Sequence, residues 1–254
     1  MMSGHFPPDW IRRSGSNLLF IEGNLGATKT NFLQALDARA PWTVHQEPTD
    51  LWRQFPINTL TEVGQSVNNH FRQTPSGLSK NLLEGIYFGG VKNFTFQSML
   101  INYYLDTISK EMTRCQSNLA FERGIYSSHH FFTNIHRQMG SINEVEGTVL
   151  DRQFQTAHEL LDKAWKDRRV TFVYLKDTTE ACLKRIHERG RWEEEHVRQD
   201  FLEELARTHD TFFEAMQSQD YYGAIQINLR HYTKNGHINH SVMVTDLLSV
   251  LGAQ

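Results

Sequence analysis

The segment from Leu18 to Thr30 constrains the fold of this chain more than any other part. It begins with an apolar run, Leu-Leu-Phe-Ile, which predicts a buried strand. A loop containing Gly23 and Gly26 follows and ends in Lys-Thr, and a helix is expected from Asn31 to Ala38. Strand, glycine-containing loop and helix in this order form the layout of a phosphate-binding P-loop, whose pattern is G-x-x-x-x-G-K-[ST]. The sequence therefore predicts a nucleotide-binding protein.

We expect this loop to bind the phosphates of a nucleotide. The phosphates are expected to lie against eight consecutive residues: Gly23, Asn24, Leu25, Gly26, Ala27, Thr28, Lys29 and Thr30. Backbone N–H groups of the loop and the positive end of the helix dipole attract anions. Lys29 would reach the β- and γ-phosphates, and the Thr30 hydroxyl would bind Mg²⁺. The alternative is a plain strand-turn-helix with an incidental lysine.

Thr28 departs from the P-loop pattern, because it stands where the pattern has its second glycine. A β-branched residue tolerates a positive φ badly, and such strain costs about 1–3 kcal/mol. If Thr28 has to adopt that conformation, we expect nucleotide affinity to fall by about one to two decades. Gly26 offers compensating freedom within the same loop.

Length and composition place the chain among ordinary globular proteins. It has 254 residues, of which 39% are hydrophobic and 22% charged, and we expect a single domain over residues 17–254 after a flexible segment at 1–16. The net charge of −3 argues against nucleic acid or an anionic membrane as a partner. Two cysteines cannot build a disulfide framework. No secretory signal is recognised, so we expect a cytoplasmic protein, with mitochondrial or nuclear placement left open.

Short β-rich runs alternate with long helical patterns along the chain. The expected strands are Asn17–Glu22, Trp42–Glu47, Asn118–Glu122, Val170–Leu175 and Ala224–Leu229. The expected helices between and after them are Phe94–Gln116, Glu144–Trp165, Thr178–Glu188, Glu195–Gln217 and Ser241–Leu251. This alternation predicts an α/β fold: a five-stranded parallel sheet with helices on both faces. Ligands of such sheets bind at the carboxyl ends of the strands, where the pairs Glu22-Gly23, Glu47-Pro48 and Glu122-Arg123 stand.

Four further segments, in this order, complete a pattern. They are Glu47 to Trp52 after the second strand, Phe94 to Gln97 at the start of a long helix, Glu122-Arg123 at the end of the third strand, and a basic stretch comprising Arg185 and Arg189 to Glu194. Together with the P-loop they resemble the deoxynucleoside kinases, the group of deoxycytidine, deoxyguanosine and mitochondrial thymidine kinases. The resemblance runs from about Leu18 to about Phe213. It implies a P-loop kinase fold with an arginine-rich lid, Mg²⁺ with ATP as phosphate donor, a deoxynucleoside as acceptor, and a homodimer.

The resemblance also implies roles for individual residues. Glu47 is similar to the family's general base, which takes the proton from the 5′-hydroxyl of the substrate, and Arg123 and Lys29 complete the catalytic set. Glu122 resembles a carboxylate near Mg²⁺, beside Thr30. The deoxynucleoside is expected to contact Glu47, Trp52, Tyr87, Gln97, Tyr104, Arg123, Ser128 and Glu194. The lid arginines Arg185, Arg189 and Arg191 are expected to clamp the transferring phosphoryl group.

Without the resemblance, several of these residues have simpler interpretations. The arginines could form a solvated basic helix end, which the helix dipole favours. Glu122 and Arg123 could be a buried structural ion pair, Trp52 could belong to the core, and Gln97 could be a solvated polar residue.

Besides Thr28, two places depart from the family's pattern. Gly124 stands where the family usually has serine. Tyr104 and Ser128 replace an arginine and an aspartate that pair in members accepting deoxycytidine and purines. The thymidine-accepting members also lack this pair, so the resemblance implies a pyrimidine preference. The leading hypothesis is thus ATP-dependent phosphorylation of a deoxynucleoside 5′-hydroxyl in nucleotide salvage. The alternatives are a catalytically weakened or inactive relative with a structural or regulatory role, and a nucleoside monophosphate kinase.

Overall fold

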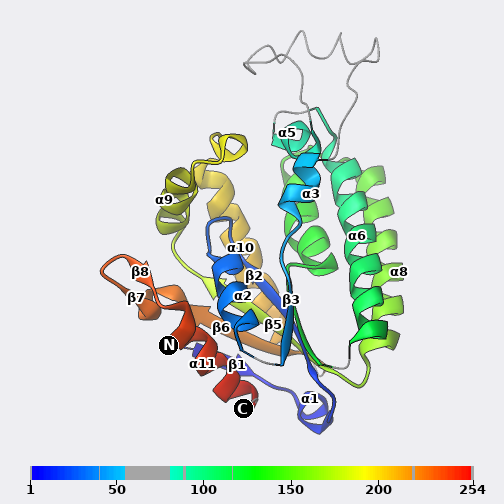
Figure 1. The fold of residues 1–254 in the computed structure, drawn as a ribbon. Helices are drawn as coiled ribbons and strands as arrows, with labels where there is room; N and C mark the ends of the chain where they lie inside the picture. The colour runs from blue at the N-terminus through cyan, green and yellow to red at the C-terminus, as the bar shows by residue number, and fades with distance from the viewer. Residues whose placement is uncertain are drawn as a thin grey trace.

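A six-stranded sheet lies at the centre of the protein, with helices on both of its faces (Figure 1). The computed structural model describes residues 2–39, 41–54, 81–87, 90–115, 117–218 and 221–252. The strands of this sheet are β1 (Met2–His5), β2 (Asn17–Gly23), β3 (Trp42–His45), β4 (Asn118–Glu122), β5 (Arg169–Lys176) and β6 (Gly223–Asn228). Their spatial order is β1-β6-β5-β2-β4-β3.

The helices fill the connections between the strands. The α-helices are α1 (Pro8–Arg12), α2 (Lys29–Asp37), α3 (Thr49–Gln54), α5 (Leu82–Tyr87), α6 (Asn93–Arg114), α7 (Asn134–Gln138), α8 (Glu144–Trp165), α9 (Thr179–Arg189), α10 (Gln199–Met216) and α11 (His240–Leu251). Shorter elements are the π-helix η1 (Ser127–Thr133), the 3₁₀-helices η2 (Trp192–Glu194) and η3 (Leu229–Tyr232), and a hairpin of β7 (Thr233–Lys234) and β8 (His237–Ile238).

The predicted parallel sheet is confirmed. Strands β2 to β6 pair in parallel, at the positions expected from the sequence. The sixth strand differs from the prediction: β1 pairs antiparallel with β6, and α1 follows it. Residues 2–12, which the sequence left outside the domain as part of a flexible segment, thus belong to the sheet and its packing. Trp10 of α1 is buried, and its indole Nε1–H donates to Thr171 Oγ1 at 3.0 Å.

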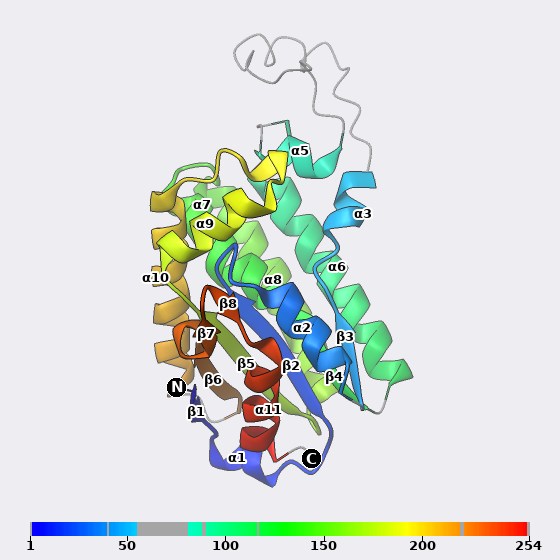
Figure 2. The same ribbon diagram turned by 60° about the vertical axis from the view of Figure 1, so that its left-hand side comes forward.

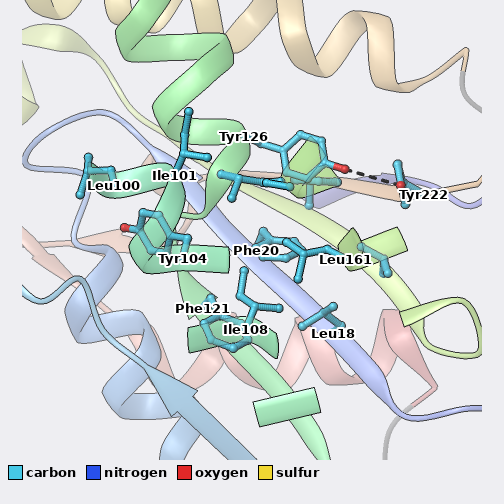
Figure 3. Packing of buried hydrophobic residues seen from close by; sticks show 14 of the residues in the cluster. Leu18, Phe20, Leu100, Ile101, Tyr104, Ile108, Phe121, Tyr126, Leu161 and Tyr222 are labelled. Carbon is cyan, nitrogen blue, oxygen red and sulfur yellow. Dashed lines mark hydrogen bonds between the residues drawn. The ribbon is translucent and has the colours of Figure 1, made fainter. Parts of the chain in front are cut away.

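Alternation along β2 divides the core into two layers. Leu18 and Phe20 point to the face covered by α6, α8 and α10, whereas Leu19 and Ile21 point to the face covered by α2 and α11. All four side chains are fully buried, as a strand with both faces covered requires. Figure 3 shows the first layer, in which aromatic and aliphatic side chains of the sheet meet those of the helices. In Figure 2, α2 and α11 lie side by side on the other face.

The helix ends follow signals in the sequence. Asn143 and Glu146 form a capping box at the start of α8. Thr178 caps α9, which ends at Gly190 in the left-handed conformation that favours glycine. Asn239 caps α11. The last two caps fix the starts of α9 and α11, two of the helices that contact the P-loop.

The topology places the candidate site. The chain leaves β2 in the middle of the sheet, builds β3 at one edge, and returns to insert β4 between them. The carboxyl ends of β2, β3 and β4 therefore meet at the point where the strand order reverses, where α/β sheets bind ligands. In the part of the chain that the structure describes, none of the helices combines the length and apolarity needed to cross a membrane.

Candidate active site

The loop between β2 and α2 has the backbone of a phosphate cradle. Gly23 and Gly26 adopt positive φ angles of 149° and 75°. A Cβ on Gly26 would lie 2.4 Å from the carbonyl oxygen of Cys182, and a Cβ on Gly23 would lie 2.8 Å from that of Leu175. Both glycines are therefore required by the close approach of neighbouring backbone as well as by their conformation.

Thr28 adopts the left-handed backbone conformation in which we expected it to be strained. Its φ is 57° and its ψ 26°, in the left-handed region, immediately before the first residue of α2. Thr28 therefore takes the backbone conformation of the missing glycine. Its hydroxyl oxygen Oγ1 is hydrogen-bonded to Nε2 of His240 at 3.1 Å.

Lys29 lies inside the loop. Its ammonium group donates to the carbonyl oxygens of Gly23 (3.2 Å) and Asn24 (3.0 Å), and the side chain is buried. Burial, and secondarily the positive charge of Arg123, lowers the pKa of Lys29 to about 8. The amine is thus held within the curve of the P-loop, where a phosphate would stabilise its charged form.

Two polar side chains hold the loop from outside. The Asn24 amide donates to the carbonyl of Leu202 at 2.8 Å, so the loop is tied to α10. Arg185 Nε donates to the Gly26 carbonyl at 2.7 Å, and its Nη2 donates to Asp177 at 2.6 Å. Arg185, expected from the sequence as a lid arginine, therefore contacts the backbone of the P-loop directly.

Oxygen atoms suited to a divalent cation gather at the end of the loop. The Thr30 hydroxyl donates to Oε2 of Glu122 at 2.9 Å, and the backbone N–H of Glu47 points to the same carboxylate oxygen at 3.4 Å. Hydroxyl and carboxylate oxygens are the ligands that Mg²⁺ prefers, and it is usually bound through one or two carboxylates together with phosphates and water. Among the described residues, no group of three or more His, Cys, Asp or Glu side chains could enclose a metal ion. The ligand chemistry of Thr30 and Glu122 fits a magnesium ion held through one carboxylate and one hydroxyl, with phosphates and water as its other ligands.

Arg123 lies between two carboxylates at the end of β4. Its Nε is 3.3 Å from Glu47 Oε1, and its Nη1 is 3.9 Å from Glu22 Oε2. The side chain is 2% exposed, its φ is 67°, and none of its guanidinium nitrogens has a hydrogen-bond partner within the described residues. The guanidinium also lies over the ring of Phe132, 4.9 Å from its centroid. Arg123 thus presents buried, unsatisfied donors next to Glu47, as a site for anionic oxygens requires.

Glu22 and Ser127 belong to this cluster, although neither was assigned a specific role in the predicted site. Ser127 Oγ donates to Glu22 Oε1 at 2.5 Å, and Glu22 is fully buried. Burial raises the pKa of Glu22 to about 7, although the nearby charge of Arg123 opposes the shift. The position of Glu22 at a strand end marked it for chemistry, whereas Ser127 lies on the π-helix η1, which no sequence pattern indicated.

A second polar pair lies on the helices beyond Glu122. Ser128 Oγ donates to Oε1 of Gln97 at 2.7 Å, and both residues are buried. The Tyr104 hydroxyl donates to the carbonyl of Glu122 at 3.4 Å. Trp52 packs edge-on against Phe96, with ring centroids 5.3 Å apart. Trp52 and Tyr104, two of the residues predicted to contact a nucleoside, therefore belong to the apolar layer that covers this face of the sheet, and Figure 3 labels Tyr104.

Gly124 has a packing reason in this chain. A Cβ at this position would lie 3.0 Å from the ring of Phe20. Serine here would thus press on Phe20, a fully buried ring of β2. The Gly124 backbone N–H donates to Ser127 Oγ at 3.1 Å, so a neighbouring hydroxyl contacts this strand end.

The basic stretch, which begins within α9 and continues past its end, is folded around acidic side chains. Arg189 and Arg191 both contact Glu194, the latter at 3.4 Å. Arg53 of α3 bonds to Glu193 at 2.7 Å and so joins the basic stretch to the other side of the site. Burial, together with the charges of Glu194 and Glu47, raises the pKa of Tyr87 well above its ordinary value. The negative charges of both carboxylates thus disfavour ionisation of the Tyr87 hydroxyl.

Comparison with known proteins agrees with this geometry. The family model described as deoxynucleoside kinase matches residues 19–243. The chain is 30% identical to deoxycytidine kinase 1 of Xenopus laevis over 203 residues, which are 76% of this chain and 72% of that protein. It is 27% identical to deoxycytidine kinase 2 of Gallus gallus over 251 residues, covering 91% and 89% of the two chains. Mitochondrial deoxyguanosine kinase of Xenopus laevis is 26% identical over 204 residues, with coverages of 76% and 72%.

Proposed function

Since the chain belongs to the deoxynucleoside kinase family, we propose that it transfers the γ-phosphoryl group of ATP to the 5′-hydroxyl of a deoxynucleoside, with a preference for pyrimidines. The observation that carries this proposal is the convergence of a P-loop, a carboxylate and a buried arginine. Lys29, Glu47 and Arg123 come from three separate strand-to-helix connections and meet at one end of the sheet. Such an arrangement suits a reaction catalysed mainly by positioning and by charge stabilisation.

Glu47 is the proposed general base. Its carboxylate is partly exposed, at 19%, whereas Glu22 is fully buried. A partly exposed carboxylate can reach a substrate hydroxyl and accept its proton as the new bond to phosphorus forms. Arg123 orients this carboxylate through the 3.3 Å contact and has further N–H donors for phosphoryl oxygens.

Lys29, the loop amides and the lid arginines would stabilise the triphosphate. Lys29 already lies along the inside of the P-loop, bonded to two of its carbonyls. Thr30 and Glu122 would hold Mg²⁺, which when bound neutralises charge on the β- and γ-phosphoryl oxygens. Arg189 and Arg191 would add positive charge from the opposite side, with Glu194 holding the two guanidinium groups in place.

The proposed base preference rests on Gln97 and its neighbours. Because Ser128 donates to Gln97 Oε1, the orientation of the amide is fixed. The amide Nε2 is then left to donate to a base, and the second lone pair of Oε1 can still accept from it. Tyr104, seven residues after Gln97 on α6, is buried and bonded to the Glu122 carbonyl, and a side chain of this size on the same helix would favour a smaller, one-ring base.

A homodimer is part of the proposal, and the surface of α8 supports it. Val145, Val149 and Leu160 of this helix are exposed by 73%, 41% and 51%. Apolar side chains gathered on one helix are typical of a surface that another chain covers. Light scattering during gel filtration would give about twice the chain mass if this is correct. Cytoplasmic placement remains a proposal of the same kind, tested by imaging of the tagged protein.

One observation favours the alternative of a weakened or inactive kinase. Thr28 occupies a left-handed backbone conformation that disfavours β-branched residues. A phosphate-transfer assay with labelled Mg-ATP and, separately, thymidine, deoxycytidine, deoxyadenosine and deoxyguanosine distinguishes the two. The proposal predicts transfer to at least one nucleoside, with the highest kcat/KM for a pyrimidine. Folded protein that binds Mg-ATP and phosphorylates none of the four would support the alternative.

A further inference from the structure

Thr28 lies directly before α2, whose first two residues are the expected phosphate and Mg²⁺ ligands, although its left-handed backbone disfavours a β-branched side chain. Its carbonyl oxygen accepts from Phe32 N–H at 3.0 Å and so begins the hydrogen bonds of α2. The next two residues are Lys29 and Thr30. The backbone direction at Thr28 therefore sets where the phosphate-binding amine and the hydroxyl point.

A distant side chain contacts this strained residue. His240 is the first residue of α11, and its Nε2 lies 3.1 Å from Thr28 Oγ1. The contact draws the threonine hydroxyl toward α11. Thr28 keeps its left-handed backbone while its polar atom has a partner outside the loop.

The position of His240 is itself fixed. Helix α11 packs against α2 (Figures 1 and 2). Asn239, which caps α11, receives a bond from Val242 N–H at 3.1 Å and donates its own N–H to the Tyr232 carbonyl at 2.9 Å. Arg39, just after α2, donates to Ser241 at 3.3 Å. The imidazole therefore approaches Thr28 from a supported helix end.

We propose that His240 is a positioning residue of the nucleotide site, which holds Thr28 in the conformation that the P-loop requires and so compensates for the missing glycine. This inference rests on the proposed function, because it assumes that the loop binds ATP. It predicts an energetic coupling: the histidine matters when residue 28 is threonine, and becomes dispensable when residue 28 is glycine.

The test is a double-mutant cycle on the affinity for Mg-ATP, measured by calorimetry without nucleoside so that no turnover is needed. The four proteins are wild type, His240→Ala, Thr28→Gly and the double variant. His237→Ala is the matched control, because His237 is an exposed histidine of the same C-terminal region. His240→Gln replaces the imidazole by a side-chain amide that can also hydrogen-bond to the Thr28 hydroxyl, and we expect it to keep part of the affinity that His240→Ala loses. Where alanine prevents folding, His240→Phe retains a ring without the nitrogen and serves the same purpose.

Loss of one hydrogen bond predicts a roughly three- to tenfold rise in the Kd for Mg-ATP on His240→Ala. In the Thr28→Gly background we expect the same substitution to change the Kd by less than about twofold, because glycine needs no such support. An equal effect in both backgrounds, or no effect in the wild-type background, would overturn the inference. Protein that binds Mg-ATP with this coupling yet phosphorylates no nucleoside would contradict the proposed function alone, whereas wild-type protein that does not bind Mg-ATP would overturn both.

Discussion

Glu47 and Arg123 meet at the ends of two neighbouring parallel strands, with Glu47 Oε1 3.3 Å from Arg123 Nε. The arginine is buried and the carboxylate partly exposed. Because the guanidinium is fixed on the protein side, the carboxylate can face an incoming hydroxyl. This contact between the two side chains connects the fold to the proposed phosphoryl transfer.

Replacing Arg123 by lysine should impair turnover more than substrate binding. Lysine keeps the positive charge but loses the planar fork that can contact Glu47 and phosphoryl oxygens together. Removing such a donor from a preorganised site lowers kcat by about 10²–10³-fold. Steady-state kinetics and a thermal melt of Arg123→Lys check this. Wild-type kcat in the lysine variant would show that the fork geometry has no catalytic role.

Ser128→Ala should affect the nucleoside and leave ATP unaffected. Without the 2.7 Å bond from Ser128, the Gln97 amide is free to rotate in a buried place. Loss of this orientation is expected to raise the KM for the nucleoside about three- to tenfold, the effect of one hydrogen bond. Ser141→Ala, at an exposed serine, is the control. A Ser128→Ala variant that changed the KM for ATP instead would contradict the placement of this pair in the nucleoside pocket.

The lid arginines can be separated from ordinary surface arginines. Arg189→Gln is expected to lower kcat by about 10²-fold or more, because it removes a positive charge that would stabilise the transferring phosphoryl group. Arg198→Gln is the matched control, since Arg198 is exposed and pairs with Asp200. Both variants should bind the nucleoside with affinities close to that of the wild type. Similar kcat values for Arg189→Gln and Arg198→Gln would remove Arg189 from the proposed mechanism.

Glu22 should make stability fall as the pH rises. Burial raises its pKa in the folded state to about 7 from an ordinary value of 4.5, so the folded state binds more protons than the unfolded state between these values. The free energy of unfolding therefore decreases as the pH rises from about 4.5 to about 7. Glutamine has no proton that titrates in this range. In Glu22→Gln the free energy of unfolding should therefore lose this part of its dependence on pH. Urea denaturation of both proteins from pH 5 to pH 8 measures the difference, and parallel curves would contradict the shifted pKa.

The sheet and its long helices could be predicted from the sequence, because β-rich apolar runs and helical periodicity are local signals. Helix α8 and strand β4 begin and end at the predicted residues. Strand β1 and helix α1 could not be predicted, since tertiary contacts such as the bond from Trp10 to Thr171 hold them in place. The π-helix η1 has no sequence pattern of its own.

The meeting of Glu47, Glu122 and Arg123 could also be anticipated, because parallel strands bring their carboxyl ends to one edge of the sheet. Two other contacts could not be anticipated: that of Arg185 with Gly26 and that of His240 with Thr28. They depend on how α9 and α11 pack beside the P-loop, which no spacing in the sequence indicates. The roles assigned to the individual site residues stay predictions.

Glu47 is the proposed base in phosphoryl transfer to a deoxynucleoside. The most direct measurement compares kcat and nucleoside Kd for wild type, Glu47→Gln and Asp50→Asn with Mg-ATP and the preferred nucleoside. Asp50 is the control, an exposed carboxylate nearby that pairs with Arg53. We predict that Glu47→Gln lowers kcat by about 10²–10⁴-fold while its Kd stays within about threefold of the wild-type value, and that Asp50→Asn behaves as wild type. A Glu47→Gln variant with wild-type kcat would show that Glu47 is not the base.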